Sequence, residues 1–185
     1  MYLTAHLDVP PLPDFSPVRA KYGLRRVPGQ ILQLVGALDA LLAEHPADPD
    51  FGLIFLSHFG PMGETAALSR DFLDYPPDQI APGHFANSVF NAPVSYLARA
   101  FNTHGPALSL AGFRHAEESA VLTVRCWLDS GFCRDAVLIR TDEHIPETEC
   151  TGVALYPVSE LFLLSSGGPG RSVTAEEILS EVMHV

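Results

Sequence analysis

The side chains best suited to covalent chemistry in this chain are three cysteines, and their surroundings argue against such a role. Cys126 lies in a mostly apolar segment, so we expect it to pack in the core as a small hydrophobic residue. Cys133 falls in an expected helix-to-strand connection and Cys150 in an acidic loop, and neither has a base beside it in the sequence. An odd number of cysteines without a C-x-x-C pair indicates neither a disulfide framework nor a zinc site.

Acid–base or metal chemistry would call on histidines, of which the chain has eight. None forms an H-x-x-x-H or H-E-x-x-H pair, which would place two ligands on one helix face, so the sequence predicts no metal site. His58, His104 and His115 fall in expected loops or helix ends, and we interpret them as scattered surface histidines. The chain also lacks the G-x-S-x-G, G-K-[ST] and G-x-G-x-x-G motifs, so no cofactor is predicted.

The elements that must position these side chains follow from the apolar pattern. Short apolar runs predict strands at residues 2–7, 53–56, 107–110, 136–139 and 161–164. Helical spacing predicts helices at residues 30–44, 64–73, 85–101 and 116–128. Pro93 favours a kink or a late start in the third of these helices, and the fourth is apolar enough to be buried on most sides. A capping box at Thr174 predicts a short C-terminal helix. Strands that alternate with helices indicate an α/β fold with a mixed, mostly parallel sheet.

Composition and charge limit the possible partners. The chain has 185 residues, of which 47% are hydrophobic, which is enough for one well-packed domain. With 22 acidic and 11 basic residues its net charge is −11, which argues against binding to nucleic acid or to a membrane surface. Without a signal-like N-terminal segment we expect a cytoplasmic, reduced protein. The chain also has one basic cluster, which consists of Arg19, Lys21, Arg25 and Arg26. This cluster is either a solvated surface at one end of the fold or a docking site for an acidic partner.

Five sequence features follow one another along the chain: Arg25-Arg26, the strand end Ser57-His58-Phe59-Gly60, the segment from Pro82 through Phe85 and Asn87-Ser88 to Asn91-Ala92, Gly105-Pro106 with the strand and turn after it, and Asp142-Glu143-His144-Ile145-Pro146-Glu147. Together they resemble the β-ketoacyl synthase-like N-terminal domain family. This family comprises short thiolase-fold relatives of ketosynthases and chain-length factors, as in aryl polyene-type pathways. The resemblance implies half of a thiolase-like fold at residues 1–164, followed by a Gly-rich turn and a short helix at residues 165–185.

The resemblance also implies that the reaction centre is missing. In condensing enzymes a turn after the strand delivers a cysteine to the start of a buried helix, where the helix N-terminus favours the thiolate. Here the matching position holds Arg114. A helix N-terminus is unfavourable for a cation, so we expect Arg114 to have a compensating partner such as Glu117 or Glu118.

These features favour a non-catalytic, chain-length-factor-like partner of a full-length ketosynthase or an acyl carrier protein in fatty acid or polyketide assembly. Association as a homo- or hetero-oligomer is expected through the strand at residues 107–110 and the helix at residues 87–97. The expected partner-binding residues are Arg19, Lys21, Arg25, Arg26, Asn87, Ser88, Asn91 and Leu108. One alternative is an acyl transferase or hydrolase whose nucleophile is Cys133, Ser88 or Ser109, placed within hydrogen-bond reach of a histidine. Another is a structural remnant with a small-molecule pocket.

Overall fold

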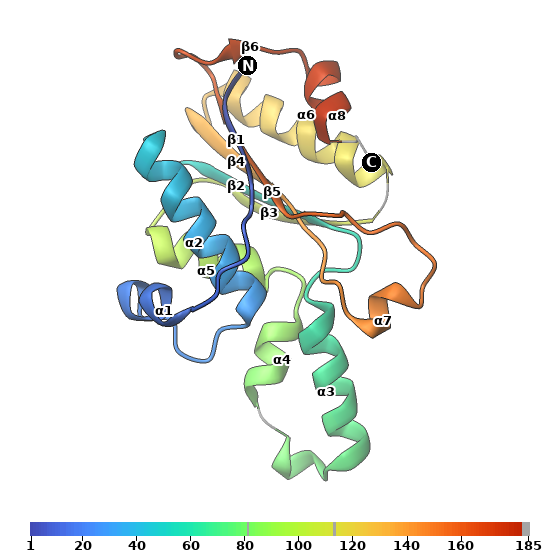
Figure 1. The fold of residues 1–185 in the computed structure, drawn as a ribbon. Helices are drawn as coiled ribbons and strands as arrows, with labels where there is room; N and C mark the ends of the chain where they lie inside the picture. The colour runs from blue at the N-terminus through green and yellow to red at the C-terminus, as the bar shows by residue number, and fades with distance from the viewer. Residues whose placement is uncertain (81, 113, 183–185) are drawn as a thin grey trace.

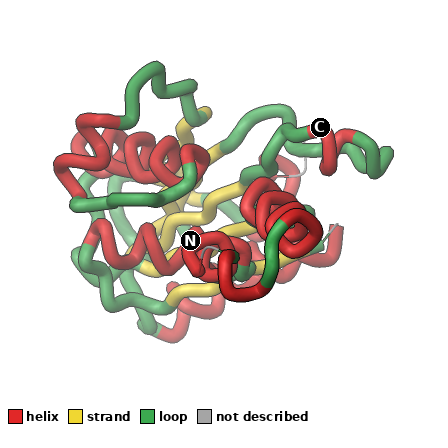
Figure 2. The backbone as a smooth tube through the Cα atoms, turned by 90° about the horizontal axis from the view of Figure 1, so that it is seen from below, coloured by secondary structure: helices red, strands yellow, loops and turns green. Residues whose placement is uncertain are grey.

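The computed structural model describes residues 1–80, 82–112 and 114–182, with Arg114 described by its backbone alone. A six-stranded sheet lies between two layers of helices (Figures 1 and 2). The strand order across the sheet is β3-β2-β4-β5-β1-β6. The strands are β1 (Tyr2–Asp8), β2 (Gly52–Ser57), β3 (Ala107–Ala111), β4 (Asp135–Arg140), β5 (Glu160–Ser165) and β6 (Arg171–Ser172). All five strands expected from the sequence are therefore present, together with the short β6.

The sheet is mixed, and only one side of it is parallel. Strand β2 pairs in parallel with β3 and with β4, whereas β5 runs antiparallel to β4 and to β1, and β6 runs antiparallel to β1. The parallel pairs follow from helical crossovers between the strands. The segment between β4 and β5 contains only the one-turn helix α7 (Pro146–Glu149), so the chain returns beside β4 in the opposite direction. Antiparallel pairing is thus more extensive than the apolar runs alone predict.

Each face of the sheet has its own helices and its own core (Figure 1). On one face lie α1 (Ser16–Tyr22), α2 (Gly29–Glu44) and α5 (Ala92–Phe101), and on the other lie α6 (Arg114–Ser130) and α8 (Ala175–Val182). Strand β2 shows why its run is continuously apolar: Leu53 and Phe55 belong to the α2-side core, and Ile54 and Leu56 to the α6-side core. A strand covered on both faces has no polar side to expose.

The helical hairpin of α3 (Met62–Asp74) and α4 (Pro82–Ser88) projects beyond the end of the sheet (Figure 1). The expected helix at residues 85–101 is in fact two helices, because the chain breaks after Ser88 and restarts at Ala92. Pro93 stands in the first turn of α5, where its missing N–H costs no helical hydrogen bond, so the late start was the correct one of the two alternatives.

Helix α6 is less buried than its composition predicts. Its sheet-facing residues Ala120, Val121, Val124 and Leu128 are buried, but Leu122 is 52% exposed and Cys126 lies on the outer surface. The expectation that Cys126 packs in the core is therefore wrong, because the apolar residues of this segment occupy both faces of the helix rather than one.

The C-terminal segment closes the α6-side core. The capping box expected at Thr174 is confirmed: the Thr174 backbone N–H donates to Glu177 Oε2 over 2.6 Å, and the Glu177 N–H donates to Thr174 Oγ1 over 3.1 Å. Helix α8 then packs against α6, with Ile178 and Val182 buried. Among the described residues, no helix is long and apolar enough to cross a membrane.

Candidate functional site

The strand–turn–helix that would present a nucleophile is formed as the sequence predicts. Strand β3 ends at Ala111, Gly112 adopts a φ of +128° that suits glycine, and α6 begins at Arg114. The side chain of Arg114 lies outside the described residues, so its expected ion pair is not placed. Of the two expected partners, Glu117 is buried and accepts a hydrogen bond from the Tyr156 hydroxyl over 3.0 Å, and Glu118 lies 3.4 Å from His115.

A His–Asp pair lies at the carboxyl ends of the parallel strands β2 and β4. His58 directly follows β2, and its Nδ1 lies 2.6 Å from Oδ2 of Asp142, whose side chain is 1% exposed. The Ser57 hydroxyl and the His58 backbone N–H both donate to Asp142 Oδ1 over 2.8 Å, and the Tyr156 N–H donates to Oδ2 over 3.1 Å. An ionised carboxylate only accepts, so the pair holds the proton of His58 on Nδ1.

Buried ionisable groups extend from this pair across the α6-side face. Tyr156 packs on His58 with ring centroids 4.3 Å apart and planes tilted by 33°, and the Arg140 guanidinium lies 4.7 Å from the Tyr156 ring centre. Arg140 is 2% exposed and donates to the Glu160 carboxylate and to the carbonyl of Val182. Burial, followed by the Glu117 carboxylate, raises the pKa of Tyr156 well above its usual range, and burial lowers the pKa of Arg140. This network ties β4, β5, α6 and α8 together.

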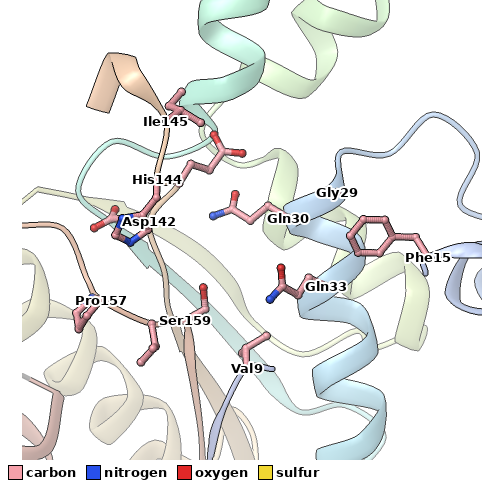
Figure 3. Close-up of a pocket in the computed structure, with 12 residues that line it drawn as sticks. Val9, Phe15, Gly29, Gln30, Gln33, Asp142, His144, Ile145, Pro157 and Ser159 are labelled. Carbon is pink, nitrogen blue, oxygen red and sulfur yellow. The ribbon is translucent and has the colours of Figure 1, made fainter. Parts of the chain in front are cut away.

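A pocket of about 500 Å³ opens beside Asp142, between the start of α2 and the segment after β4 (Figure 3). Gln30 and Gln33 reach into it from α2, and their amide groups donate to Thr141 Oγ1 and to the carbonyl of Pro10, each over 3.1 Å. His144 bonds the carbonyl of Tyr156 over 2.7 Å. Glu143 also lines this pocket, and burial raises the pKa of its carboxyl group. Gln30 and His144 thus hold the segment after β4 in place, and Gln33 holds the segment after β1.

A second hollow, of about 450 Å³, lies between α5 and β3, and it brings together two of the expected partner-binding residues. Asn91 and Leu108 both line it, together with Ser109, whose buried Oγ has no hydrogen-bond partner in the described part of the chain. Leu108 also packs in part against the α6-side core. Strand β3 is at the edge of the sheet, so its outer backbone groups face away from β2.

Two other expected contact residues form hydrogen bonds within the chain. Asn87 is 7% exposed, accepts from the Tyr96 hydroxyl over 2.8 Å, and donates to the carbonyl of Arg26 over 3.5 Å. Ser88 donates to the carbonyl of Phe85 in its own helix. Asn87 thereby joins the Arg25–Arg26 loop to α4, a contact that no sequence pattern indicates.

Among the described residues, two members of the basic cluster have partners for their side chains and two do not. Lys21 pairs with Asp39 at 2.6 Å, and Arg19 donates to the carbonyls of Leu24 and Val27 over 3.3 and 3.1 Å. Arg25 and Arg26 are exposed, and neither side chain forms an ion pair among the described residues. The available positive charge of the cluster therefore lies on these two arginines.

The cysteines and serines of the enzymatic alternative lie apart from the His–Asp pair. Cys133 packs beside Gly52, at the opposite end of β2 from His58, roughly 20 Å away along the strand. Burial raises the pKa of the Cys133 thiol, which disfavours the nucleophilic thiolate. Neither Cys133 nor Ser88 nor Ser109 hydrogen-bonds a histidine within the described ranges. The geometry provides none of them with a general base.

Comparison with protein-family models gave no match, and comparison with curated proteins gave none either. Solved structures do share the fold. One is a ketosynthase (ApeO) in complex with its chain length factor (ApeC) from Xenorhabdus doucetiae, matched at a TM-score of 0.63 and 17% identity over 91% of this chain and 81% of that chain. Another is the ishigamide ketosynthase/chain length factor, with a TM-score of 0.67 and 18% identity over 83% of this chain and 48% of that chain.

A third structure is a type II polyketide synthase acyl-carrier protein in complex with its ketosynthase, AntDE:AntF, with a TM-score of 0.54 and 13% identity over 73% of this chain and 42% of that chain. The chain thus spans less than half the length of two of the three matched chains and most of the Xenorhabdus chain. At 13–18% identity the likeness concerns the fold. The resemblance seen in the sequence is confirmed at the level of the fold: the chain has half of a thiolase-like fold of the kind found in these ketosynthase structures.

Proposed function

We propose that this chain is a non-catalytic, chain-length-factor-like partner of a ketosynthase in fatty acid or polyketide assembly of the aryl polyene type. The observation that carries the proposal is the open edge of β3, beside a strand–turn–helix whose helix begins with Arg114 instead of a cysteine. Two of the structures that share the fold are ketosynthases with chain length factors, and one matched chain is covered to 81% by this short chain. That correspondence in length supports a half-domain that acts through association.

The hydrogen bonds of β3 identify which backbone groups are available to a partner. The Leu53 N–H donates to the carbonyl of Pro106, and the Gly112 N–H donates to the carbonyl of Ser57. In a parallel pair, alternate residues point their N–H and C=O groups to the same neighbour. The even-numbered residues therefore bond β2, and the backbone of Ala107, Ser109 and Ala111 faces the open edge.

An added strand from a partner would bond these outward groups and cover the hollow between β3 and α5. The side chain of Ser109 supports this location, because its buried Oγ has no partner among the described residues and a neighbouring strand could supply one. Ala107 and Ala111 at the two ends of β3 are exposed and small, which permits close approach.

A variant pair at Ser109 tests the association. Ser109→Pro removes one outward N–H while every β2–β3 hydrogen bond remains, because proline is tolerated on the outer side of an edge strand. Ser109→Ala keeps the N–H and serves as the control: loss of the hydroxyl should at most weaken the complex, because the outward backbone groups remain. We expect wild type and Ser109→Ala to form a complex with a full-length ketosynthase co-expressed from the same genome, measured by co-purification and light scattering. Ser109→Pro should remain folded by circular dichroism and elute alone.

If Ser109→Pro recovers as much synthase as the wild type does, the interface does not involve the edge of β3. A wild-type chain that stays monomeric and binds no synthase would refute the proposed association itself. Either result is separable from misfolding, because the far-ultraviolet spectrum of each variant is measured on the same sample.

Contact with an acyl carrier protein is assigned to Arg25 and Arg26. Carrier proteins are acidic, and a chain with a net charge of −11 repels them except where positive charge is available. Reversing both arginines to glutamate should abolish carrier binding, and binding by the wild type should weaken as salt rises, since screening shortens attraction to about 8 Å at physiological ionic strength. Lys21→Gln is the matched control, because Asp39 already neutralises Lys21. If the double variant binds the carrier protein as well as the wild type does, the two arginines do not contact the carrier and serve only to keep their loop in solvent.

The absence of catalysis is tested separately. After incubation with an acyl carrier protein that bears a labelled acyl group, intact mass spectrometry should find this chain unmodified. Stoichiometric acylation of Cys133 or of a serine would instead establish the acyl transferase or hydrolase alternative.

A further inference from the structure

Three side chains with metal-binding atoms meet on the antiparallel pair β1–β5. His6 and Asp8 lie on one side of β1, and the backbone pairing sets Asp8 opposite Glu160 and His6 opposite Phe162. One ligand atom from each of His6, Asp8 and Glu160 lies within 4.8 Å of the other two. In the part of the chain that the structure describes, no other set of three such residues comes together in this way.

The separations within this cluster are those of ligands around a single ion. His6 Nε2 lies 3.0 Å from Glu160 Oε1 and 3.6 Å from Asp8 Oδ1. Zinc holds nitrogen and oxygen ligands at about 2.0–2.2 Å, so adjacent ligands of one ion stand roughly 3–4 Å apart. An ion placed between the three atoms would replace the His6–Glu160 hydrogen bond and would need little movement beyond rotation of the Asp8 side chain, which is 71% exposed.

Neighbouring groups hold two of the three ligands in position. The His6 ring stacks on Phe162 with centroids 4.4 Å apart and planes within 3°, which fixes its orientation. The Glu160 side chain is 8% exposed, and its second oxygen accepts from the buried Arg140 guanidinium, leaving Oε1 directed at His6. Hydrogen bonds of this kind behind a ligand orient it and commonly change metal affinity by about 10- to 100-fold.

We propose that His6, Asp8 and Glu160 form a zinc-binding site, with the remaining coordination positions open to water. One imidazole and two carboxylates suit Zn²⁺, whereas Mg²⁺ and Ca²⁺ favour oxygen-only sets. Asp8 and Glu160 supply negative charge to the ion, although Glu160 shares its charge with the Arg140 guanidinium. A bound ion would join β1 to β5, two strands distant in the sequence, and this role is independent of the proposed partner function.

Direct titration tests the site. The full-length, untagged chain, freed of metal with a chelator, is titrated with ZnSO₄ by isothermal calorimetry, and with Co²⁺ as a spectroscopic probe. We expect one Zn²⁺ per chain with a dissociation constant below about 10 µM, and a rise in melting temperature on binding. His6→Ala and Asp8→Asn should each weaken binding at least about tenfold and remove the rise in melting temperature.

His115→Ala is the matched control. His115 lies 3.4 Å from Glu118 on the surface, so it reproduces a histidine–carboxylate pair that belongs to no three-ligand group among the described residues. This variant should bind Zn²⁺ as the wild type does. Equal affinity of the wild type, His6→Ala and Asp8→Asn would overturn the proposal, as would a wild type that binds no stoichiometric Zn²⁺. Because His6 and Asp8 are both exposed, neither substitution is expected to unfold the chain.

Discussion

The carboxylate of Asp142 lies 2.6 Å from Nδ1 of His58 and joins the ends of two parallel strands that are 84 residues apart in the sequence. Its other oxygen accepts from the Ser57 hydroxyl, which in turn accepts from the backbone N–H of Gly60 over 2.9 Å. One buried side chain thus shapes the turn after β2 and fixes the histidine in it. This explains why Ser57-His58 and the Asp142 segment, far apart in the chain, both belong to the ketosynthase-like pattern.

Removing the Asp142 carboxylate should strongly destabilise the fold. In Asp142→Ala, the donors of Ser57, His58 and Tyr156 lose their buried acceptor, and we expect the free energy of unfolding to fall by about 3–5 kcal/mol. Urea denaturation measures the loss. The control is Asp129→Ala, an exposed carboxylate paired with Arg125 one helical turn away, with an expected cost below about 0.5 kcal/mol. Similar costs for the two variants would contradict a structural role for Asp142.

The glycine of the Gly105-Pro106 pair should be intolerant of even one methyl group. A Cβ at Gly105 would overlap the backbone carbonyl oxygens of Asp50 and Phe51, and neither can move without disturbing the start of β2. Gly105→Ala should therefore cost about 1–3 kcal/mol or more. At Gly83, in α4, a Cβ meets open space, so Gly83→Ala should stabilise by about 0.5 kcal/mol. The melting temperatures of the two variants are compared by thermal denaturation. Equal melting temperatures would contradict the close approach at Gly105.

The positions of the helices and strands could be predicted from local sequence patterns. The predictions that were wrong concern strand direction and side-chain exposure, which depend on tertiary packing. The runs at β2, β4 and β5 were recognisable because strands covered on both faces are apolar throughout. The antiparallel direction of β5 could not be recognised in this way, because strand direction depends on the path of the segment after β4. The exposure of Cys126 was missed because an apolar count ignores which side of α6 each residue occupies.

The candidate sites could be predicted only where local sequence patterns mark them. Turn chemistry and the Gly-Pro pair predicted β3 and the start of α6, and the family resemblance implied that β3 is the strand that meets a partner. The pairing of His58 with Asp142 and the cluster of His6, Asp8 and Glu160 each join residues more than 80 positions apart. Motif spacing detects ligands that share one helix or loop, so a site built across two strands leaves no local pattern.

The three thiols should differ in reactivity according to their burial. Cys126 and Cys150 are exposed, whereas Cys133 is buried and its thiol pKa is raised by that burial. In native protein, a thiol-reactive chromophore should label two cysteines quickly and the third only after denaturant is added. Cys126→Ser should remove one fast equivalent. Labelling of only one thiol in the native wild type would contradict the exposure of Cys126.

Stability at alkaline pH should depend on Tyr22. Burial, followed by its hydrogen bond to Asp39, raises the pKa of Tyr22 to about 12, whereas a tyrosine in an unfolded chain titrates near 10. A raised folded pKa contributes stability that is fully present below pH 10 and is lost as the pH rises from 10 through 12. Unfolding free energies from urea titrations at pH 9, 10 and 11 should therefore decline less steeply for Tyr22→Phe than for the wild type. Tyr75→Phe, at an exposed position after α3, is the control and should leave the slope unchanged. Parallel declines for the wild type and Tyr22→Phe would mean that the phenol of Tyr22 titrates alike in the folded and unfolded chain.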